Sequence, residues 1–78
     1  MALVAFVLIQ TETARAFSVA EAVRAIDGVT ASDVVTGPYD VIAELQEATL
    51  DELAKLVVSR IQTINGVTRT YLCPVFTL

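Results

Sequence analysis

A chain of 78 residues is long enough for one small domain, which buries only about 60% of the surface that its unfolded form exposes. Yet 55% of the residues are hydrophobic, more than so small a globule can enclose, so we expect another molecule to cover part of its surface. The net charge of −4 and the five scattered basic residues disfavour direct binding of nucleic acid. With one cysteine, Cys73, and no histidine, the chain offers neither an intrachain disulfide nor a Cys/His metal site.

No segment of the sequence has the features of a membrane span or an export signal. Charged residues interrupt every apolar run well before the ~20 residues that a spanning helix needs. The opening run from Ala2 to Ile9 is too short for a signal peptide, lacks a basic start and is followed by Gln10-Thr11-Glu12 rather than a cleavage site. We therefore expect a cytoplasmic protein with no membrane partner and with Met1 as its native start.

The first predicted elements are a strand and a helix. The segment from Leu3 to Gln10 is apolar on both alternating faces, which is typical of a central strand covered on both sides. A helix is predicted between Thr13 and Ile26, with Ser18 and Glu21 as an inner capping-type pair. Its predicted apolar stripe consists of Val19, Ala22, Val23 and Ile26.

Two further strands are predicted around a sharp turn. Residues 30–36 form the second strand, Gly37-Pro38 forces a turn, and residues 40–46 form the third strand. Val41, Ala43 and Leu45 would share one face of that third strand.

The second helix has the clearest start signal, because Thr49 and Glu52 have the spacing of a capping box. We assign Glu52 no role beyond this first turn. The predicted apolar stripe is Leu50, Leu53, Val57, Ile61 and Ile64. The last strand would run from about residue 68 to residue 76, and Pro74 within it favours a position at the edge of the sheet, because proline cannot donate to a strand ladder.

The chain contains an internal repeat, since Ile26-Asp27-Gly28-Val29-Thr30 recurs as Ile64-Asn65-Gly66-Val67-Thr68. Each copy would end a helix at a glycine and begin a strand. Two similar halves of strand, helix and strand predict an α+β fold, the ferredoxin-like split βαβ sandwich with an antiparallel sheet (βαββαβ).

In this fold both helices cover one face of the sheet, and here the other face cannot be polar. The first strand is apolar on both faces, and Ile42, Phe76 and either Tyr71 or Leu72 would add to the open one. We expect face-to-face homodimerisation, which gives a dimeric α+β barrel.

Four segments resemble the effector-binding domain of the Lrp/AsnC transcription regulators, also called the RAM domain. They are Ala5–Ile9, Ile26–Val29, Val35–Asp40 and Ile64–Thr70. The resemblance covers nearly the whole chain and implies one domain over residues 1–78, in a stand-alone form without the usual helix-turn-helix domain. It also implies a dimer assembled into an octamer or decamer ring, an amino acid effector bound between dimers, and possible mixed assembly with full-length Lrp/AsnC regulators.

The first candidate ligand segment is the loop formed by Thr36, Gly37, Pro38, Tyr39 and Asp40. Glycine lets backbone amides approach a carboxylate and Asp40 could pair with an ammonium group, so the loop could hold both ends of an amino acid. Alternatively, Gly37 and Pro38 only shape the turn and Asp40 accepts backbone hydrogen bonds. The resemblance implies that the loop lies at the ligand site, although Pro38 stands where many relatives have a donating amide.

The second candidate segment is Thr68, Arg69, Thr70 and Leu72. The resemblance implies that it approaches the ligand from a neighbouring subunit, where its hydroxyls could bind a carboxylate. The structural alternative is that Thr68 and Thr70 are simply good strand residues and that Arg69 is a solvated or interface cation.

Two other functions are known for proteins of similar predicted fold, a small enzyme and a different regulatory module. Similar dimeric α+β barrels include small monooxygenases, but such sites generally use His, Trp or Asn, and the single Asn65 is explained by a helix end, so we expect no enzyme, cofactor or metal. An ACT-type regulatory module would pair its subunits side by side instead. Tyr39 and Tyr71 could line a pocket or only pack, and Cys73 is expected to be a small buried hydrophobe.

Overall fold

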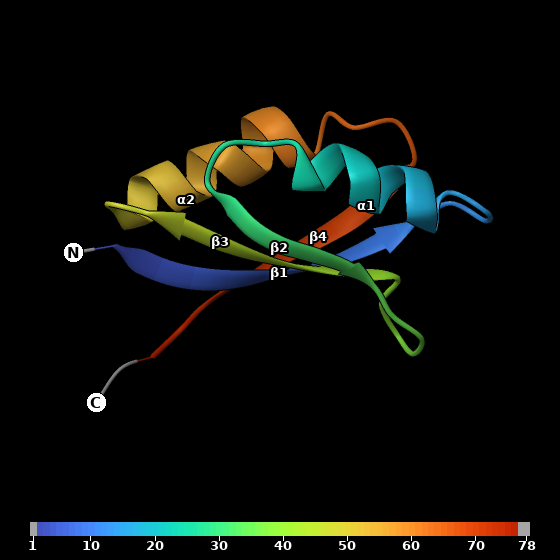
Figure 1. Cartoon of the computed structure of the whole chain (residues 1–78), viewed down its shortest axis with the longest axis horizontal. Helices are drawn as coiled ribbons and strands as arrows, with labels where there is room; N and C mark the ends of the chain where they lie inside the picture. The colour runs from blue at the N-terminus through green and yellow to red at the C-terminus, as the bar shows by residue number, and fades with distance from the viewer. Residues whose placement is uncertain (1, 77–78) are drawn as a thin grey trace.

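The strands form one antiparallel sheet with both helices on the same side of it (Figure 1). The computed structural model describes residues 2–76. The elements are β1 (Leu3–Thr11), α1 (Ala16–Arg24), β2 (Val29–Val34), β3 (Val41–Glu47), α2 (Leu50–Leu56), the π-helical turn η1 (Val57–Ile61) and β4 (Val67–Pro74). The strand order β2-β3-β1-β4 confirms the predicted split βαβ fold, with β1 inside the sheet and β4, which contains Pro74, at its edge.

The core lies between the sheet and the helices. Alternate residues of the two central strands are fully buried on this side: Ala5, Val7 and Ile9 on β1, and Val41, Ala43 and Leu45 on β3. The helices bury Val19, Ala20, Val23, Leu53, Leu56, Val57 and Ile61 against them. The predicted inward face of the third strand is therefore confirmed.

Helix α1 differs from its prediction in two details. Ser18 and Glu21 do not cap it: the Ser18 hydroxyl donates to Arg15 O, and the Glu21 carboxylate pairs with Arg24 at 3.3 Å. Within the stripe, Ala22 is exposed and Ala20 is buried in its place. The helix begins at Ala16, so Ser18 lies inside its first turn, where its hydroxyl reaches back to a carbonyl instead of preceding the helix.

Helix α2 begins as predicted and ends in a wider turn. Thr49 Oγ1 accepts a hydrogen bond from Glu52 N at 3.1 Å, which confirms Thr49 as the N-cap. The Glu52 carboxylate accepts from the Thr49 hydroxyl at 3.3 Å, in place of the backbone N–H of a full capping box. Leu50, expected in the buried stripe, is 54% exposed. Over η1 the helix widens, and Gln62 N donates to Val57 O, five residues earlier.

Both copies of the internal repeat make the same local structure. In the first, Val29 N donates to Ile26 O at 3.1 Å, and in the second Val67 N donates to Ile64 O at 3.2 Å. Gly28 and Gly66 have φ values of +97° and +102°, which side chains disfavour. The helix end predicted for each copy of the repeat is therefore confirmed.

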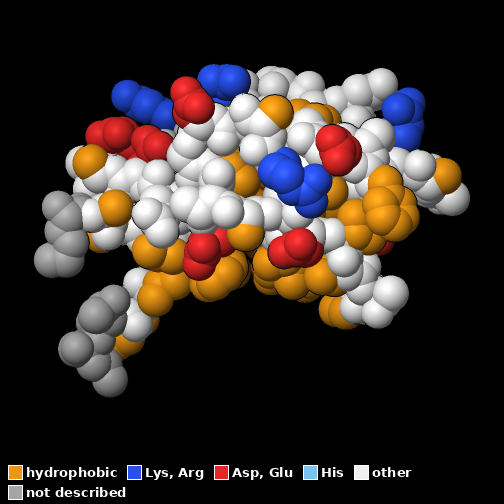
Figure 2. Space-filling model, viewed as in Figure 1, with side chains coloured by type: hydrophobic (Ala, Val, Ile, Leu, Met, Phe, Trp, Pro, Cys, Tyr) orange, Lys and Arg blue, Asp and Glu red, His pale blue; other side chains and the backbone are white. Residues whose placement is uncertain are grey.

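The face of the sheet away from the helices carries a band of hydrophobic side chains, visible along the lower side of Figure 2. Strand register places Ile42 and Tyr71 on either side of Leu8, and Cys73 beside Phe6. We call these five residues, together with Val4, the open face. Tyr71 therefore belongs to this face, whereas Leu72 packs partly against the core.

Two expectations at the C-terminal end need adjustment. Cys73, predicted to be buried, is exposed in the single chain, because it lies on the uncovered side of an edge strand. Phe76 lies beyond the end of β4, is 83% exposed, and belongs to a segment that leaves the sheet on the side opposite the helices (Figure 1). Within residues 2–76, no helix is long and apolar enough to cross a membrane.

Candidate functional site

The loop between β2 and β3 is attached to the end of β1 through Asp40. Asp40 Oδ2 accepts a hydrogen bond from Thr11 N at 2.8 Å, and Asp40 N donates to Ile9 O at 2.9 Å. Val35 N closes the loop by donating to Asp40 O, also at 2.9 Å. The carboxylate of Asp40 thus has a structural partner in the isolated chain, and only its remaining acceptor positions are available to a ligand.

We expect Asp40→Ala to lower the free energy of unfolding by about 1–3 kcal/mol, because it leaves the part-buried Thr11 N without a partner. Asp40→Asn keeps an acceptor oxygen at this position and should lose much less. Urea denaturation of the two variants at equal protein concentration measures the difference. Equal stability of both variants and the parent protein would show that this hydrogen bond does not hold the loop.

Gln10, at the end of β1, links the two candidate segments. Its side-chain amide donates to Pro38 O at 3.1 Å, and its backbone carbonyl accepts a hydrogen bond from Thr68 Oγ1, also at 3.1 Å. In the strand register Gln10 lies opposite Arg69. The loop and the start of β4 therefore meet across the end of β1.

Aromatic side chains make a second contact between the segments. The Tyr39 and Tyr71 rings meet edge to face with centroids 5.7 Å apart, and Arg69 Nη1 donates to the Tyr71 hydroxyl at 3.2 Å. Arg69 and Tyr71 share a face of β4, because they lie opposite Gln10 and Leu8. One end of the open face thus carries two aromatic rings and a guanidinium group.

Two of the predicted residues lie on the other side of the sheet. Thr70 and Leu72 face the helices and line a cleft of about 230 Å³ together with Ala54, Val57, Val58 and Gln62. Thr70 Oγ1 accepts a hydrogen bond from Gln62 Nε2 at 2.9 Å. A single chain therefore does not bring all nine predicted residues into one pocket.

The tip of the loop is open to approach. Thr36, Gly37 and Pro38 are exposed, and apart from these three residues no atom lies within 4 Å of where a Cβ on Gly37 would be. Its φ of +133° turns the backbone in a way that residues with a side chain rarely adopt. The glycine is thus required by the turn, and the exposed backbone beside it is accessible to a carboxylate.

Sequence reasoning missed Gln10. The available signal was a polar residue at the end of an apolar strand, but its role depends on strand register, which the sequence did not supply. Within residues 2–76, no group of three Cys, Asp or Glu side chains is arranged to hold a metal ion.

Comparison with known proteins relates the chain to one family. The family model for the Lrp/AsnC ligand binding domain matches residues 4–77. Comparison with curated proteins found no match. Among solved structures, TTHA0845 from Thermus thermophilus is 33% identical with a TM-score of 0.91, and the match covers 97% of this chain and 95% of that one.

Two solved transcription regulators show the same fold in longer chains. E. coli AsnC is 23% identical with a TM-score of 0.88, and the match covers 97% of this chain and 52% of AsnC. The regulator NMB0573 from Neisseria meningitidis, solved in complex with L-Met, is 21% identical with a TM-score of 0.84, and the match covers 96% of this chain and 50% of that one. At these identities the likeness concerns the fold alone. The family model extends over nearly all residues of this chain, which therefore belongs to the Lrp/AsnC ligand-binding domain family.

Proposed function

We propose that this protein is an effector-binding and oligomerisation domain that senses an amino acid and acts without a DNA-binding domain of its own. Family membership supports a regulatory binding role rather than catalysis. A solved relative consists of little more than this domain, since the match covers 95% of the TTHA0845 chain but only 52% of AsnC, and this supports the proposed stand-alone form. Residues 1–78 would then act as one domain, in the cytoplasm with the regulators that it would join.

The observation that carries the proposal is the meeting of two predicted ligand segments at one end of the open face. Tyr39 and Pro38 contact Tyr71 and Gln10, while the accessible backbone of Gly37 lies at the tip. An ammonium group could bind the free acceptor positions of Asp40, and a carboxylate could bind Arg69 or the loop amides. The complex of NMB0573 with L-Met supports an amino acid as the ligand class.

Association of copies completes the proposed site. Thr70 and Leu72 face the helix side of β4, so they can contact the same ligand as the loop only when they come from a different subunit. The open face provides the surface for a homodimer, since its apolar side chains lack a covering layer in the single chain. Rings of dimers, and mixed rings with full-length Lrp/AsnC regulators, are the larger assemblies that we propose.

Isothermal titration with the common amino acids tests the sensing role. We expect at least one of them to bind saturably and Arg69→Gln to weaken that binding about tenfold or more, because a charge-assisted hydrogen bond is lost. Arg15→Gln is the matched control, since Arg15 precedes α1 and lies outside both predicted segments. Absence of saturable binding across the panel would leave the domain with an assembly role only.

A further inference from the structure

A cleft outside the predicted ligand site is lined mostly by charged side chains. It has a volume of about 300 Å³ and lies between the turn after α1, the end of β3 and one side of α2 and η1. Its lining residues are Asp27, Glu47, Glu52, Lys55, Leu56 and Arg60. All six belong to one chain, so the cleft exists without any subunit contact.

The charged side chains of the cleft form no ion pairs with one another. Within residues 2–76 the one ion pair joins Arg24 to Glu21, which lie elsewhere on α1. The lining includes three acidic and two basic residues, and no ion pair joins any two of them. A ligand that carries both signs of charge could satisfy them together.

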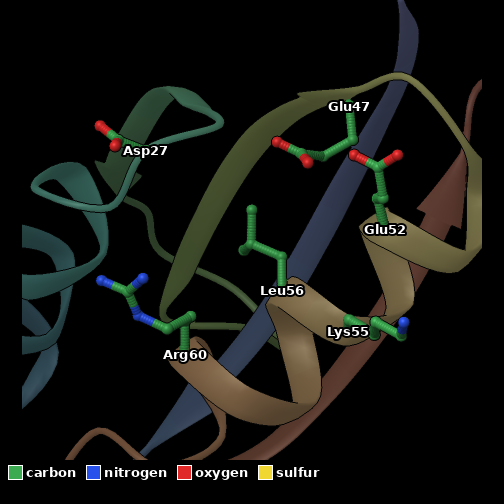
Figure 3. A pocket seen from close by; sticks show the side chains of 6 residues that line it. All are labelled: Asp27, Glu47, Glu52, Lys55, Leu56 and Arg60. Carbon is green, nitrogen blue, oxygen red and sulfur yellow. The ribbon is translucent and has the colours of Figure 1, made fainter.

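The side chains that line the cleft are arranged by charge along its length (Figure 3). Asp27 and Arg60 lie at one end, and Glu47 and Glu52 lie close together at the other. The side chain of Leu56 points into the space between the two ends, while Lys55 points away on the far side of α2. Leu56 is 7% exposed, so it gives the cleft a small apolar floor between a mixed-charge end and an acidic end.

Gly28 makes room for this arrangement. A Cβ at this position would lie 2.5 Å from Glu47 Oε1 and 2.8 Å from Leu56 Cδ1, so any side chain would displace both. Glu52 is fixed by Thr49, whose hydroxyl donates to Glu52 Oε1 at 3.3 Å and leaves the second carboxylate oxygen available. The two glutamates are thus placed by the repeat glycine and by the N-cap Thr49.

We propose that this cleft binds a small molecule with the charge pattern of a basic amino acid, such as L-lysine. The ligand carboxylate binds Arg60 and its α-ammonium group lies beside Asp27. Its aliphatic stem covers Leu56, and its distal ammonium group lies at Glu47 and Glu52. The two positive groups of the ligand complement the three carboxylates, its negative group complements Arg60, and each chain holds one such site.

Titration calorimetry at low ionic strength tests this proposal with three probes. We expect L-lysine to bind with one site per chain. L-norleucine keeps the head group and stem but lacks the distal ammonium group, and 1,5-diaminopentane lacks the carboxylate. Each should bind about tenfold more weakly than L-lysine, and added salt should weaken L-lysine binding because the charges are exposed.

Variants assign the binding to this cleft. Glu47→Gln and Arg60→Gln should each weaken L-lysine binding about tenfold, whereas Asp51→Asn and Arg15→Gln, which alter charges outside the cleft, should leave it unchanged. Thermal unfolding of each variant verifies that it is folded, and Glu47→Asp provides a second test of the acidic end.

Three results would overturn the inference. One is the absence of saturable heat with L-lysine at two temperatures, and another is equal affinity for L-lysine and L-norleucine. The third is L-lysine binding that Arg69→Gln removes but Glu47→Gln and Arg60→Gln leave intact. This last result would assign L-lysine to the site between subunits and would support the proposed sensing function while excluding the cleft.

Discussion

Replacing Leu8 with glutamate is expected to convert the assembled protein into monomers. Leu8 lies at the centre of the open face, between Ile42 and Tyr71 on the adjacent strands. In a face-to-face dimer each subunit would bury one uncompensated carboxylate at this point, at a cost of several kcal/mol per ion. A loss of about 4 kcal/mol raises the dissociation constant about a thousandfold, which sedimentation velocity at micromolar protein would detect as a shift to the monomer.

Val58→Glu is the matched control for this experiment. Val58 is 60% exposed on the helix side of the molecule, so the same charge at this position should leave the face-to-face dimer intact. If the parent protein is a stable monomer, or if Leu8→Glu remains dimeric, the open face is not the dimer interface. The ligand site proposed between subunits would then lose its basis as well.

Leu53→Ala should be the most destabilising single truncation in α2. The Leu53 side chain is fully buried between the helix and the sheet, and removing it leaves a cavity. Such truncations cost about 2–5 kcal/mol, while a domain of this size has a total stability of about 4–12 kcal/mol. Urea denaturation at fixed protein concentration should show a large decrease in the midpoint, with part of the population unfolded even without denaturant if the parent stability is low.

Leu50→Ala provides the comparison within the same helix. Leu50 has the same side chain three residues earlier but is 54% exposed, so its truncation should change the free energy of unfolding by less than about 0.5 kcal/mol. A cost at Leu50 equal to that at Leu53 would show that the outer side of α2 is covered in the assembled protein.

The order of elements could be predicted because each of them carries a strong local signal. The alternation of Val41, Ala43 and Leu45 and the N-cap at Thr49 depend only on neighbouring residues, and the structure confirms both. The stripe of α1 was predicted correctly except at one position, because alanines fit either side of a helix. The prediction includes Ala22, whereas the structure exposes Ala22 and buries Ala20.

The site could be predicted only in part, because strand geometry separates residues that are adjacent in sequence. Arg69 lies on the same side of the sheet as Tyr71 and the rest of the open face, whereas Thr70 and Leu72 face the helices. The predicted set of Thr68, Arg69, Thr70 and Leu72 therefore combines residues from two faces of one strand. Which of these residues reach the same ligand depends on contacts between subunits, which local sequence patterns do not encode.

The charged cleft was missed for a different reason. Asp27, Glu47 and Arg60 come from three parts of the chain, and nothing in their sequence spacing indicates that they line the same cleft. Glu52 already had an explanation as a residue of the first turn of α2, and that explanation is correct, but the same carboxylate also lines the cleft. A residue that satisfies one structural rule can still take part in a second site.

The widened turn η1 gives this fold a way to vary over evolution. A stretch that closes five-residue hydrogen bonds holds one residue more than an α-helix needs over the same turn. Loss of one residue there would restore regular winding and leave the sheet in place. Each position of an α-helix is rotated about 100° from the next, so Arg60 would then point elsewhere. Relatives that have one residue fewer at this turn should therefore keep the same architecture and place a different side chain beside the cleft.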